Sequence, residues 1–252
     1  MTELIPWLNQ SILSSLIFCP IIGAILVALL PRKVAREGAF VVALINFVLS
    51  LHLVAHWNDA NVLRDSGFRF EENAPWLPAF GVNYHLGVDG LSVLMVILTA
   101  FLSPIVMLAS WRSVAERAKE FFVLLLLLSA AAIGAFSALD VILFYVFFEA
   151  TLIPTYVLIA GWGGARRAYA ALKFFLFTMA GSVLMWLAML FLYFRPESNN
   201  SFDYEAMKTA ANALEAGGGQ IGLWLFIAFA IAFAIKAPLF PLHTWQPDAY
   251  QQ

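Results

Sequence analysis

Three ionisable side chains interrupt long apolar runs of the sequence. Glu149 lies within FYVFFEATLIP, Lys173 within ALKFFLFT and Lys236 within AFAIKAPLF. A charge at the centre of a membrane costs at least about 2.5–3.5 kcal/mol, so such residues usually face protein or water and mark a transport path. The chemistry open to one carboxylate and two amines in these places is the binding and release of protons or small ions.

Glu149 is the most informative of the three. It follows Asp140 by nine residues, which is about 13 Å along a helix and places it near the middle of the membrane. Tyr145 shares its helical face. Pro154 cannot donate to the carbonyl of residue 150 and therefore predicts a kink. A kink beside a buried carboxylate favours local hydration and proton or ion handling, and the alternative is a structural ion pair between helices. Asp140 is expected to be the N-cap of this helix, and Asp89 that of the apolar run that begins near residue 91.

Lys236 precedes Pro238 and Pro241, neither of which has a backbone N–H to donate. The helix is therefore expected to break near 236–241. Freed carbonyls at membrane depth are tolerated only inside protein or beside water, and transporters build ion sites at such breaks. The alternative is a lysine that snorkels to the membrane surface.

His243 and Lys173 are weaker candidates. His243 follows Lys236 by seven residues and would share its face if the helix resumed. A histidine titrates near neutral pH and can relay protons, although a hydrogen-bonded core histidine explains the residue as well. Lys173 lies four residues into its expected helix, where it either snorkels to the inner surface or joins the polar path.

The composition indicates that the segments around these residues lie in a membrane. The sequence is 62% apolar and 12% charged, against about 45–50% and about 25% in soluble domains, and its mean hydropathy is +0.85. The apolar runs are unbroken rather than alternating, which predicts membrane helices. The net charge of −2 argues against nucleic acid as a partner.

The sequence offers no cofactor site of its own. The single cysteine, Cys19, cannot form an internal disulfide or hold an iron–sulfur cluster. His52, His56 and His85 lack metal-ligand spacing, and no glycine pattern for nucleotide binding is present. We therefore expect no metal and no bound cofactor, so redox cofactors would lie on other chains.

Seven apolar runs are long enough to span a membrane, and the last of them contains the two prolines. They are 11–30, 38–56, 91–110, 121–139, 140–160, 169–194 and 221–245. The long loop 57–90 is expected to form a cap with a short hairpin over 74–90. The loop 195–220 is expected to contain a surface helix over 201–216.

Lysines and arginines are distributed unevenly between the loops. Eight follow the first, third and fifth runs: Arg32, Lys33, Arg36, Arg112, Arg117, Lys119, Arg166 and Arg167. Four lie in the other loops: Arg64, Arg69, Arg195 and Lys208. Basic loops stay on the cytoplasmic side, which predicts a multi-pass protein with its N-terminus outside.

Three motifs resemble those of one family. GVDGLSVLMVILTAFLSPI resembles the third helix of the antiporter-like subunits of respiratory complex I. FYVFFEATLIPTYVLIAGWGG resembles the fifth helix of the subunit M family of proton-pumping NADH–quinone oxidoreductase, the counterpart of mitochondrial chain 4. KAPLFPLHTWQPDAY resembles that family's broken seventh helix. The resemblance covers nearly the whole chain.

The resemblance implies an all-α integral membrane protein with an antiporter-like helical bundle. Glu149 and Lys236 match the charged pair of a proton half-channel, His243 the histidine of the PLH motif, and Lys173 a basic residue often found in bacterial members. In the family, quinone reduction in distant subunits alters these protonation states. The chain would then pump protons in a bacterial inner membrane beside other antiporter-like subunits, with no redox site and no quinone site of its own.

One departure from the family is the length. Members have about fourteen helices with two inverted repeats, whereas this sequence stops at Gln252, after the broken seventh run. The sequence is then either a fragment or a truncated chain that is inactive alone, and we expect a fragment. In it, 1–120 hold the first three helices and 121–252 an incomplete first repeat.

Two other functions fit the same residues. One is a subunit of a multi-subunit cation/proton antiporter or of a membrane-bound hydrogenase, which would use the same half-channel. The other is a structural membrane scaffold in which the buried charges only pair helices.

Overall fold

Apolar helices dominate the computed structural model, which describes residues 4–59, 62 and 67–250. In that part of the chain, six helices are long and apolar enough to cross a membrane. These six agree with the first six predicted runs and so confirm the expected class, a helical membrane protein. Arg64 and Gln252, which entered the predictions above, lie outside the described residues.

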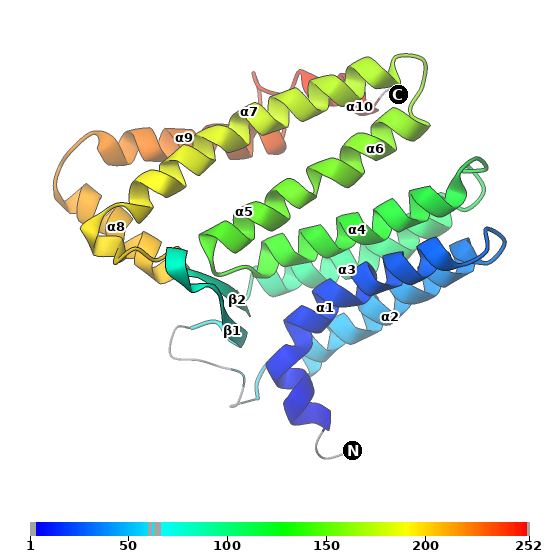
Figure 1. Cartoon of the computed structure of the whole chain (residues 1–252), viewed down its shortest axis with the longest axis horizontal. Helices are drawn as coiled ribbons and strands as arrows, with labels where there is room; N and C mark the ends of the chain where they lie inside the picture. The colour runs from blue at the N-terminus through cyan, green and yellow to red at the C-terminus, as the bar shows by residue number, and fades with distance from the viewer. Residues whose placement is uncertain (1–3, 60–61, 63–66, 251–252) are drawn as a thin grey trace. The chain divides into compact units, whose positions relative to one another are not determined.

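The helices and strands follow the order shown in Figure 1. They are α1 (Leu4–Leu29), α2 (Ala35–Ala55), β1 (Arg69–Leu77), η1 (Pro78–Phe80), β2 (Val82–Val88), α3 (Ser92–Ala109), α4 (Ala118–Ser137), α5 (Val141–Ala150), α6 (Leu152–Trp162), α7 (Arg167–Tyr193), η2 (Pro196–Ser198), α8 (Tyr204–Ala216), α9 (Ile221–Lys236) and α10 (Trp245–Tyr250).

The chain forms two compact units. The first comprises Met1–Ala74, Tyr84–Leu139 and Val146–Pro154, and the second comprises Pro75–Asn83, Asp140–Tyr145 and Thr155–Gln252. The division predicted between residues 120 and 121 concerns an internal repeat and stays a prediction.

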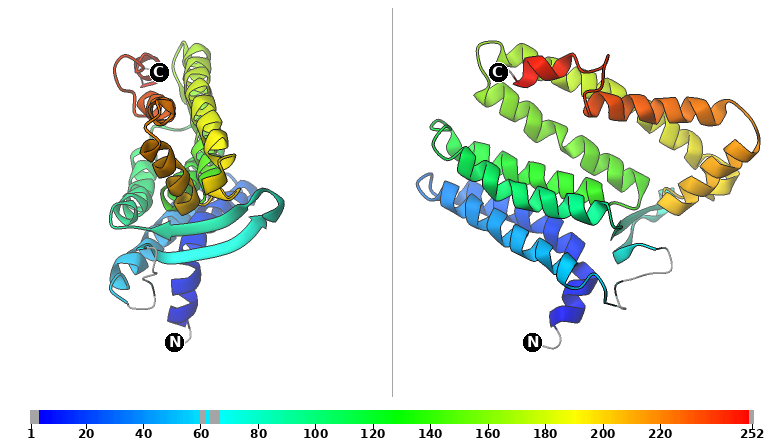
Figure 2. Two further views of the ribbon diagram at one scale, coloured as in Figure 1. Left: turned by 90° about the vertical axis from the view of Figure 1, so that its left-hand side faces the viewer. Right: turned by 180° about the vertical axis from the view of Figure 1, so that it is seen from behind.

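Helices α1 to α4 pack side by side in the first unit (Figure 2). Small residues on α1 and α2 allow the close approach, because Ala24, Ala35, Ala39 and Ala43 are all buried against one another's helices. Phe122 of α4 fills the space between them and is fully buried. The core of this unit therefore interleaves alanine faces with a few large side chains.

The long loop between α2 and α3 forms the hairpin that the sequence predicted, with β1 paired to β2. Its Glu72 reaches the first helix, which is interrupted by non-helical backbone at Ser11. The Glu72 carboxylate accepts from the backbone N–H of Leu13 at 2.7 Å and of Ser14 at 3.2 Å. A carboxylate there satisfies amides that have no partner within their own helix. Burial raises the pKa of Glu72.

Two further expected features of the loops are present. Asp89 caps α3, since its Oδ1 accepts from the N–H of Ser92 at 2.7 Å and of Leu91 at 3.0 Å. These bonds, that of Ser92 first, lower the pKa of Asp89. The expected surface helix is α8, capped by Asp203, which accepts from the N–H of Glu205 at 3.1 Å.

The second unit is built around α7, against which α8, α9 and α10 pack. An apolar cluster joins the end of α7 to α8, and Leu192, Phe202 and Met207 are buried there. Gly181 of α7 faces α9 closely, because a Cβ at this position would lie 2.7 Å from Cδ1 of Ile235. The small residue therefore fixes how near the end of α9 comes to α7.

Gly134 of α4 has the same role for α5, and its substitution tests this packing. A Cβ there would lie 2.5 Å from two ring carbons of Phe147, and a ring cannot yield as a flexible chain end does. We expect Gly134→Ala to lower the free energy of unfolding by about 1–3 kcal/mol, measured by thermal unfolding in detergent.

Gly222 in α9 is the matched control, because a Cβ there meets nothing within 4 Å. Gly222→Ala should be neutral or stabilise by up to about 1 kcal/mol, since alanine favours helix over glycine. Equal effects of the two substitutions would show that Phe147 does not pack tightly on α4.

Candidate functional site

The helix that carries Glu149 is interrupted two residues later. Helix α5 ends at Ala150 and α6 begins at Leu152, so the break that Pro154 predicted lies at Thr151. The Thr151 hydroxyl donates to the carbonyl of Phe148 at 2.7 Å. Glu149 is partly buried, with its Oε1 shielded from solvent. The carboxylate therefore lies beside irregular backbone within a membrane-spanning segment.

The start of α5 is fixed by Asp140, as the sequence predicted. Asp140 is fully buried; its Oδ1 accepts from the N–H of Ile142 at 2.9 Å and of Leu143 at 3.1 Å. Its Oδ2 accepts from the N–H of Asn83 at 2.9 Å. Burial raises the pKa of Asp140, and these hydrogen bonds oppose the rise. One side chain thus caps α5 and ties it to the tip of the hairpin.

Helix α9 ends at Lys236, and the helix resumes only at Trp245. The seventh predicted run, 221–245, is therefore a helix of 16 residues followed by a break. Pro238 cannot donate to the carbonyl of Ala234, and the N–H of Leu239 donates to it instead at 2.8 Å. The broken helix predicted from the two prolines is confirmed.

The break is closed by a tryptophan that the sequence analysis did not single out. The indole Nε1 of Trp245 donates to the carbonyl of Ile235 at 2.8 Å, an acceptor that a continuing helix would have satisfied through the N–H of Leu239. Trp245 is buried and packs its ring on Phe174 of α7, with 5.1 Å between ring centroids. The end of α9 and the start of α10 are thereby held together on α7.

His243 lies inside this break rather than on a resumed helix. The expected helical alignment with Lys236 does not occur, because no helix joins the two residues. The carbonyl of His243 accepts from the N–H of Gln246 at 2.9 Å. Its Nδ1 is buried and has no hydrogen-bond partner among the residues that the structure describes. The ring lies 5.7 Å from that of Phe240.

Lys173 is paired with a residue that the sequence analysis missed. Its Nζ lies 2.6 Å from Oδ2 of Asp248, and both side chains are about four-fifths buried, with 21% and 24% exposed. Tyr169, one turn earlier, lies with its ring 5.9 Å from the same nitrogen. The sequence signal was a carboxylate directly after the helix break, in WQPDAY.

The four predicted residues divide between the two units. Glu149 belongs to the first, while Lys173, Lys236 and His243 belong to the second. Within the second unit, α10 joins Lys173 to the broken segment through Asp248 and Trp245. No group of three or more His, Cys, Asp or Glu side chains that could hold a metal ion occurs in the described part of the chain. The arrangement provides titratable groups beside two helix breaks.

Known proteins are similar to this chain in sequence and in fold. Residues 13–134 match the family model described as NADH-ubiquinone oxidoreductase chain 4, amino terminus. Residues 138–252 match the model for the membrane part of NADH:quinone oxidoreductase/Mrp antiporter proteins. NADH-quinone oxidoreductase subunit M of Rhodobacter capsulatus is 40% identical over 96% of this chain and 48% of its own length. The chain thus spans about half the length of the curated relatives it matches.

Solved structures extend the comparison. A chain of respiratory complex I from Thermus thermophilus with bound NADH is 33% identical and superposes with a TM-score of 0.77 over 95% of this chain and 47% of that one. A chain of the Mrp complex from Dietzia sp. DQ12-45-1b shares the fold at 22% identity, with a TM-score of 0.77 over 96% of this chain and 25% of that one.

The motifs around Glu149 and Lys236 lie within the second matched region. The two family models together cover nearly all of the sequence, and the fold agrees with that of a complex I chain. The chain is a multi-pass membrane protein that belongs to the family of NADH–quinone oxidoreductase subunit M and chain 4.

Proposed function

We propose that this chain takes part in proton translocation as a membrane subunit of an NADH–quinone oxidoreductase. Electron transfer in other subunits would drive the process, and this chain would contribute ionisable side chains rather than a redox centre. We place it in a bacterial inner membrane, with its N-terminus outside and other antiporter-like subunits beside it.

One observation carries the proposal: Glu149 and Lys236 each lie at an interruption of an apolar helix. Glu149 precedes the break at Thr151 by two residues, and Lys236 is the last residue of α9. Irregular backbone at membrane depth is tolerated only inside protein or beside water, and transporters build ion sites from such broken helices. A carboxylate and an amine at these points can each take up and release a proton.

Lys173 and His243 complete the assignment. His243 lies in the break that follows Lys236, with a buried Nδ1 that can accept or donate a proton. Lys173 lies on α7, against which both α9 and α10 pack. We assign His243 as a relay within the break and Lys173, held by Asp248, as the next charged group.

The similarity of fold to the Mrp complex supports a second candidate, a subunit of a cation/proton antiporter. The same breaks would then serve exchange of protons for sodium. Transport that depends on sodium and continues without NADH oxidation would favour this candidate over the first.

Glu149→Gln tests the proposal most directly, because the amide keeps the shape and loses the titratable proton. In membrane vesicles that contain the full-length protein in its complex, we expect NADH-driven acidification to fall at least about tenfold, as for loss of an essential proton-transfer group. Acidification is measured with a pH-sensitive dye.

Electron transfer from NADH to a soluble acceptor should persist, and comigration of the variant with the NADH-active band on a native gel shows that the complex has assembled. Glu205→Gln is the control, since Glu205 is exposed on α8 and pairs with Lys208 on the same surface. Normal acidification in Glu149→Gln would remove Glu149 from the path and leave the scaffold role for its charge.

Lys236→Ala and Lys236→Arg separate proton transfer from charge. Alanine removes the positive charge, whereas arginine keeps the charge but does not release its proton. If Lys236 transfers protons, both variants should lose acidification. The same dye assay measures this. Acidification restored by arginine would mean that Lys236 supplies a fixed charge, as in a scaffold.

Lys173 and Asp248 should act as one unit. We expect Lys173→Gln and Asp248→Asn to lower the free energy of unfolding by about 1–3 kcal/mol each, since each leaves a mostly buried charge without its partner. The double variant should lose clearly less than the sum of the two. Thermal unfolding of the four proteins gives the coupling.

Glu205 and Lys208 form the control pair, 3.3 Å apart and about half exposed. Their double-variant cycle should show a coupling below about 0.5 kcal/mol, because solvent screens such pairs. Additive losses at Lys173 and Asp248 would mean that the short contact contributes no more than a surface pair does.

A further inference from the structure

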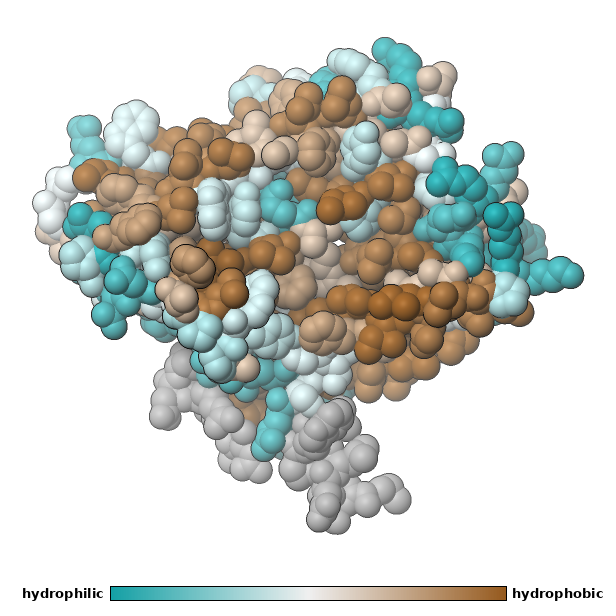
Figure 3. All heavy atoms as spheres, viewed as in Figure 1, coloured by the Kyte–Doolittle hydropathy of each residue, from teal (hydrophilic) through white to brown (hydrophobic). Residues whose placement is uncertain are grey.

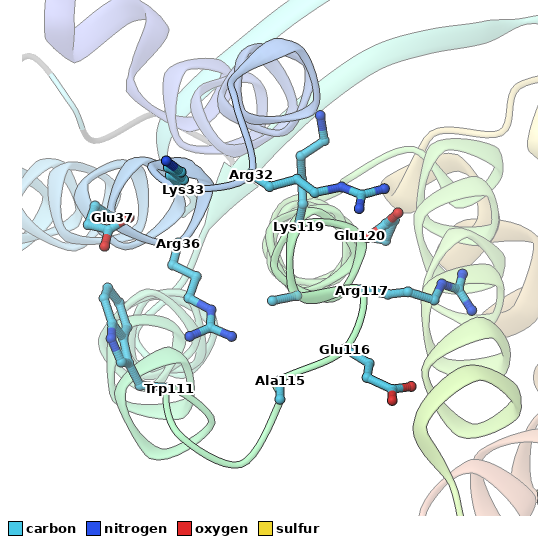
Figure 4. A pocket seen from close by; sticks show the side chains of 11 residues that line it. Arg32, Lys33, Arg36, Glu37, Trp111, Ala115, Glu116, Arg117, Lys119 and Glu120 are labelled. Carbon is cyan, nitrogen blue, oxygen red and sulfur yellow. The ribbon is translucent and has the colours of Figure 1, made fainter.

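A basic pocket lies at one end of the four-helix bundle in the first unit. Its volume is about 600 Å³, and the turn between α1 and α2 and the segment between α3 and α4 form its walls (Figure 4). Its basic lining residues are Arg32, Lys33, Arg36, Arg117 and Lys119. The proton path proposed above does not include these residues.

Two of the five cations build the walls. Arg36 donates through Nη2 to the carbonyl of Val114 at 2.6 Å, which joins the two loops. Lys119 donates to the carbonyls of Ala28 and Leu30, the latter at 3.1 Å, and so caps the end of α1. Carbonyl partners hold these side chains in place without neutralising their charge, because a carbonyl oxygen carries no net charge.

The pocket keeps an excess of positive charge. Glu37, Glu116 and Glu120 also line it, so the acidic side chains are fewer than the basic ones. Arg32 and Lys33 are exposed and form no ion pair among the described residues. Figure 4 shows the guanidinium of Arg36 pointing into the space between the two loops. A phosphate group is a suitable occupant, since arginine offers it paired donors and lysine a point charge.

The surroundings indicate a lipid rather than a free ion. Leu29 at the end of α1, Val34 at the start of α2 and Leu108 near the end of α3 are 78%, 46% and 54% exposed. Figure 3 shows hydrophilic side chains gathered at this end of the bundle, next to the hydrophobic surface along its helices. Trp111 lines the pocket at the same level, where tryptophan anchors helices at a membrane surface.

We propose that this pocket binds the phosphate-bearing head group of an anionic phospholipid, with the acyl chains lying along the exposed apolar faces of α1, α2 and α3. Basic pockets at the cytoplasmic ends of membrane helices recognise such head groups. The predicted orientation, which places these loops inside, puts the pocket at the cytoplasmic leaflet, where anionic lipids attract basic segments.

Photo-cross-linking in native membranes that contain the full-length protein tests the site. The probes are phosphatidylglycerol and phosphatidylcholine, each with the same photoreactive group in the acyl chain, and peptides from residues 29–37 and 108–120 are quantified by mass spectrometry. Phosphatidylglycerol should label these peptides about tenfold more than phosphatidylcholine, because only the former has a net charge.

Arg32→Gln and Arg112→Gln are the matched variants. Both remove one exposed arginine from a loop of the same unit, but only Arg32 lines the pocket. Arg32→Gln should lower labelling by phosphatidylglycerol roughly fivefold, and Arg112→Gln should leave it within about twofold. An unchanged thermal midpoint in both variants shows that the bundle is intact.

Three results would overturn the proposal. Equal labelling by the two lipids would exclude recognition of the head group. Equal losses in the two variants would mean that diffuse surface charge attracts the lipid. Displacement of phosphatidylglycerol by millimolar inorganic phosphate would assign the pocket to a free anion.

Discussion

The need to satisfy every backbone hydrogen bond in apolar surroundings underlies this structure. Within a membrane no water is available to bind an unpaired N–H or C=O group. A helix can therefore end only where other groups form hydrogen bonds with its terminal N–H and C=O groups. At the end of α9, the N–H of Leu239 and the indole N–H of Trp245 donate to the carbonyls of Ala234 and Ile235. These carbonyls would otherwise lack donors, because Pro238 has no N–H and the helix does not continue. The interruption is therefore an organised part of the fold.

The same constraint explains where acidic side chains occur at helix starts. Asp140 satisfies amides at the start of α5 and, at the same time, an amide of the hairpin. Glu72 does this for the first helix from a distant strand. Burial raises the pKa of both carboxyls. The N–H donors that bind each carboxylate act in the opposite direction and partly offset the cost of burying its charge.

Ionisable side chains within the apolar helices also need partners and a defined place in the packing. Lys173 pairs with Asp248 at 2.6 Å, which makes an expensive cation tolerable near the broken segment. Gly134 and Gly181 let α5 and α9 approach their neighbours closely, so the helices that carry Glu149 and Lys236 are fixed by small residues opposite large ones. Ionisable groups on helices held in this way have defined surroundings.

The sequence by itself determined the helical membrane class, the caps at Asp140 and Asp89, the hairpin between the second and third helices and the breaks near Pro154 and Pro238. Each of these depends on local composition or on the missing N–H of proline. Only the tertiary structure decided that Asp248 pairs with Lys173, that Trp245 closes the break in the seventh run, and that Glu72 binds the amides after the interruption of α1. Those contacts join residues from 10 to 75 positions apart. It also placed His243 within the irregular segment, because the helix does not resume before Trp245. Spacing along a sequence predicts a shared face only while the helix continues.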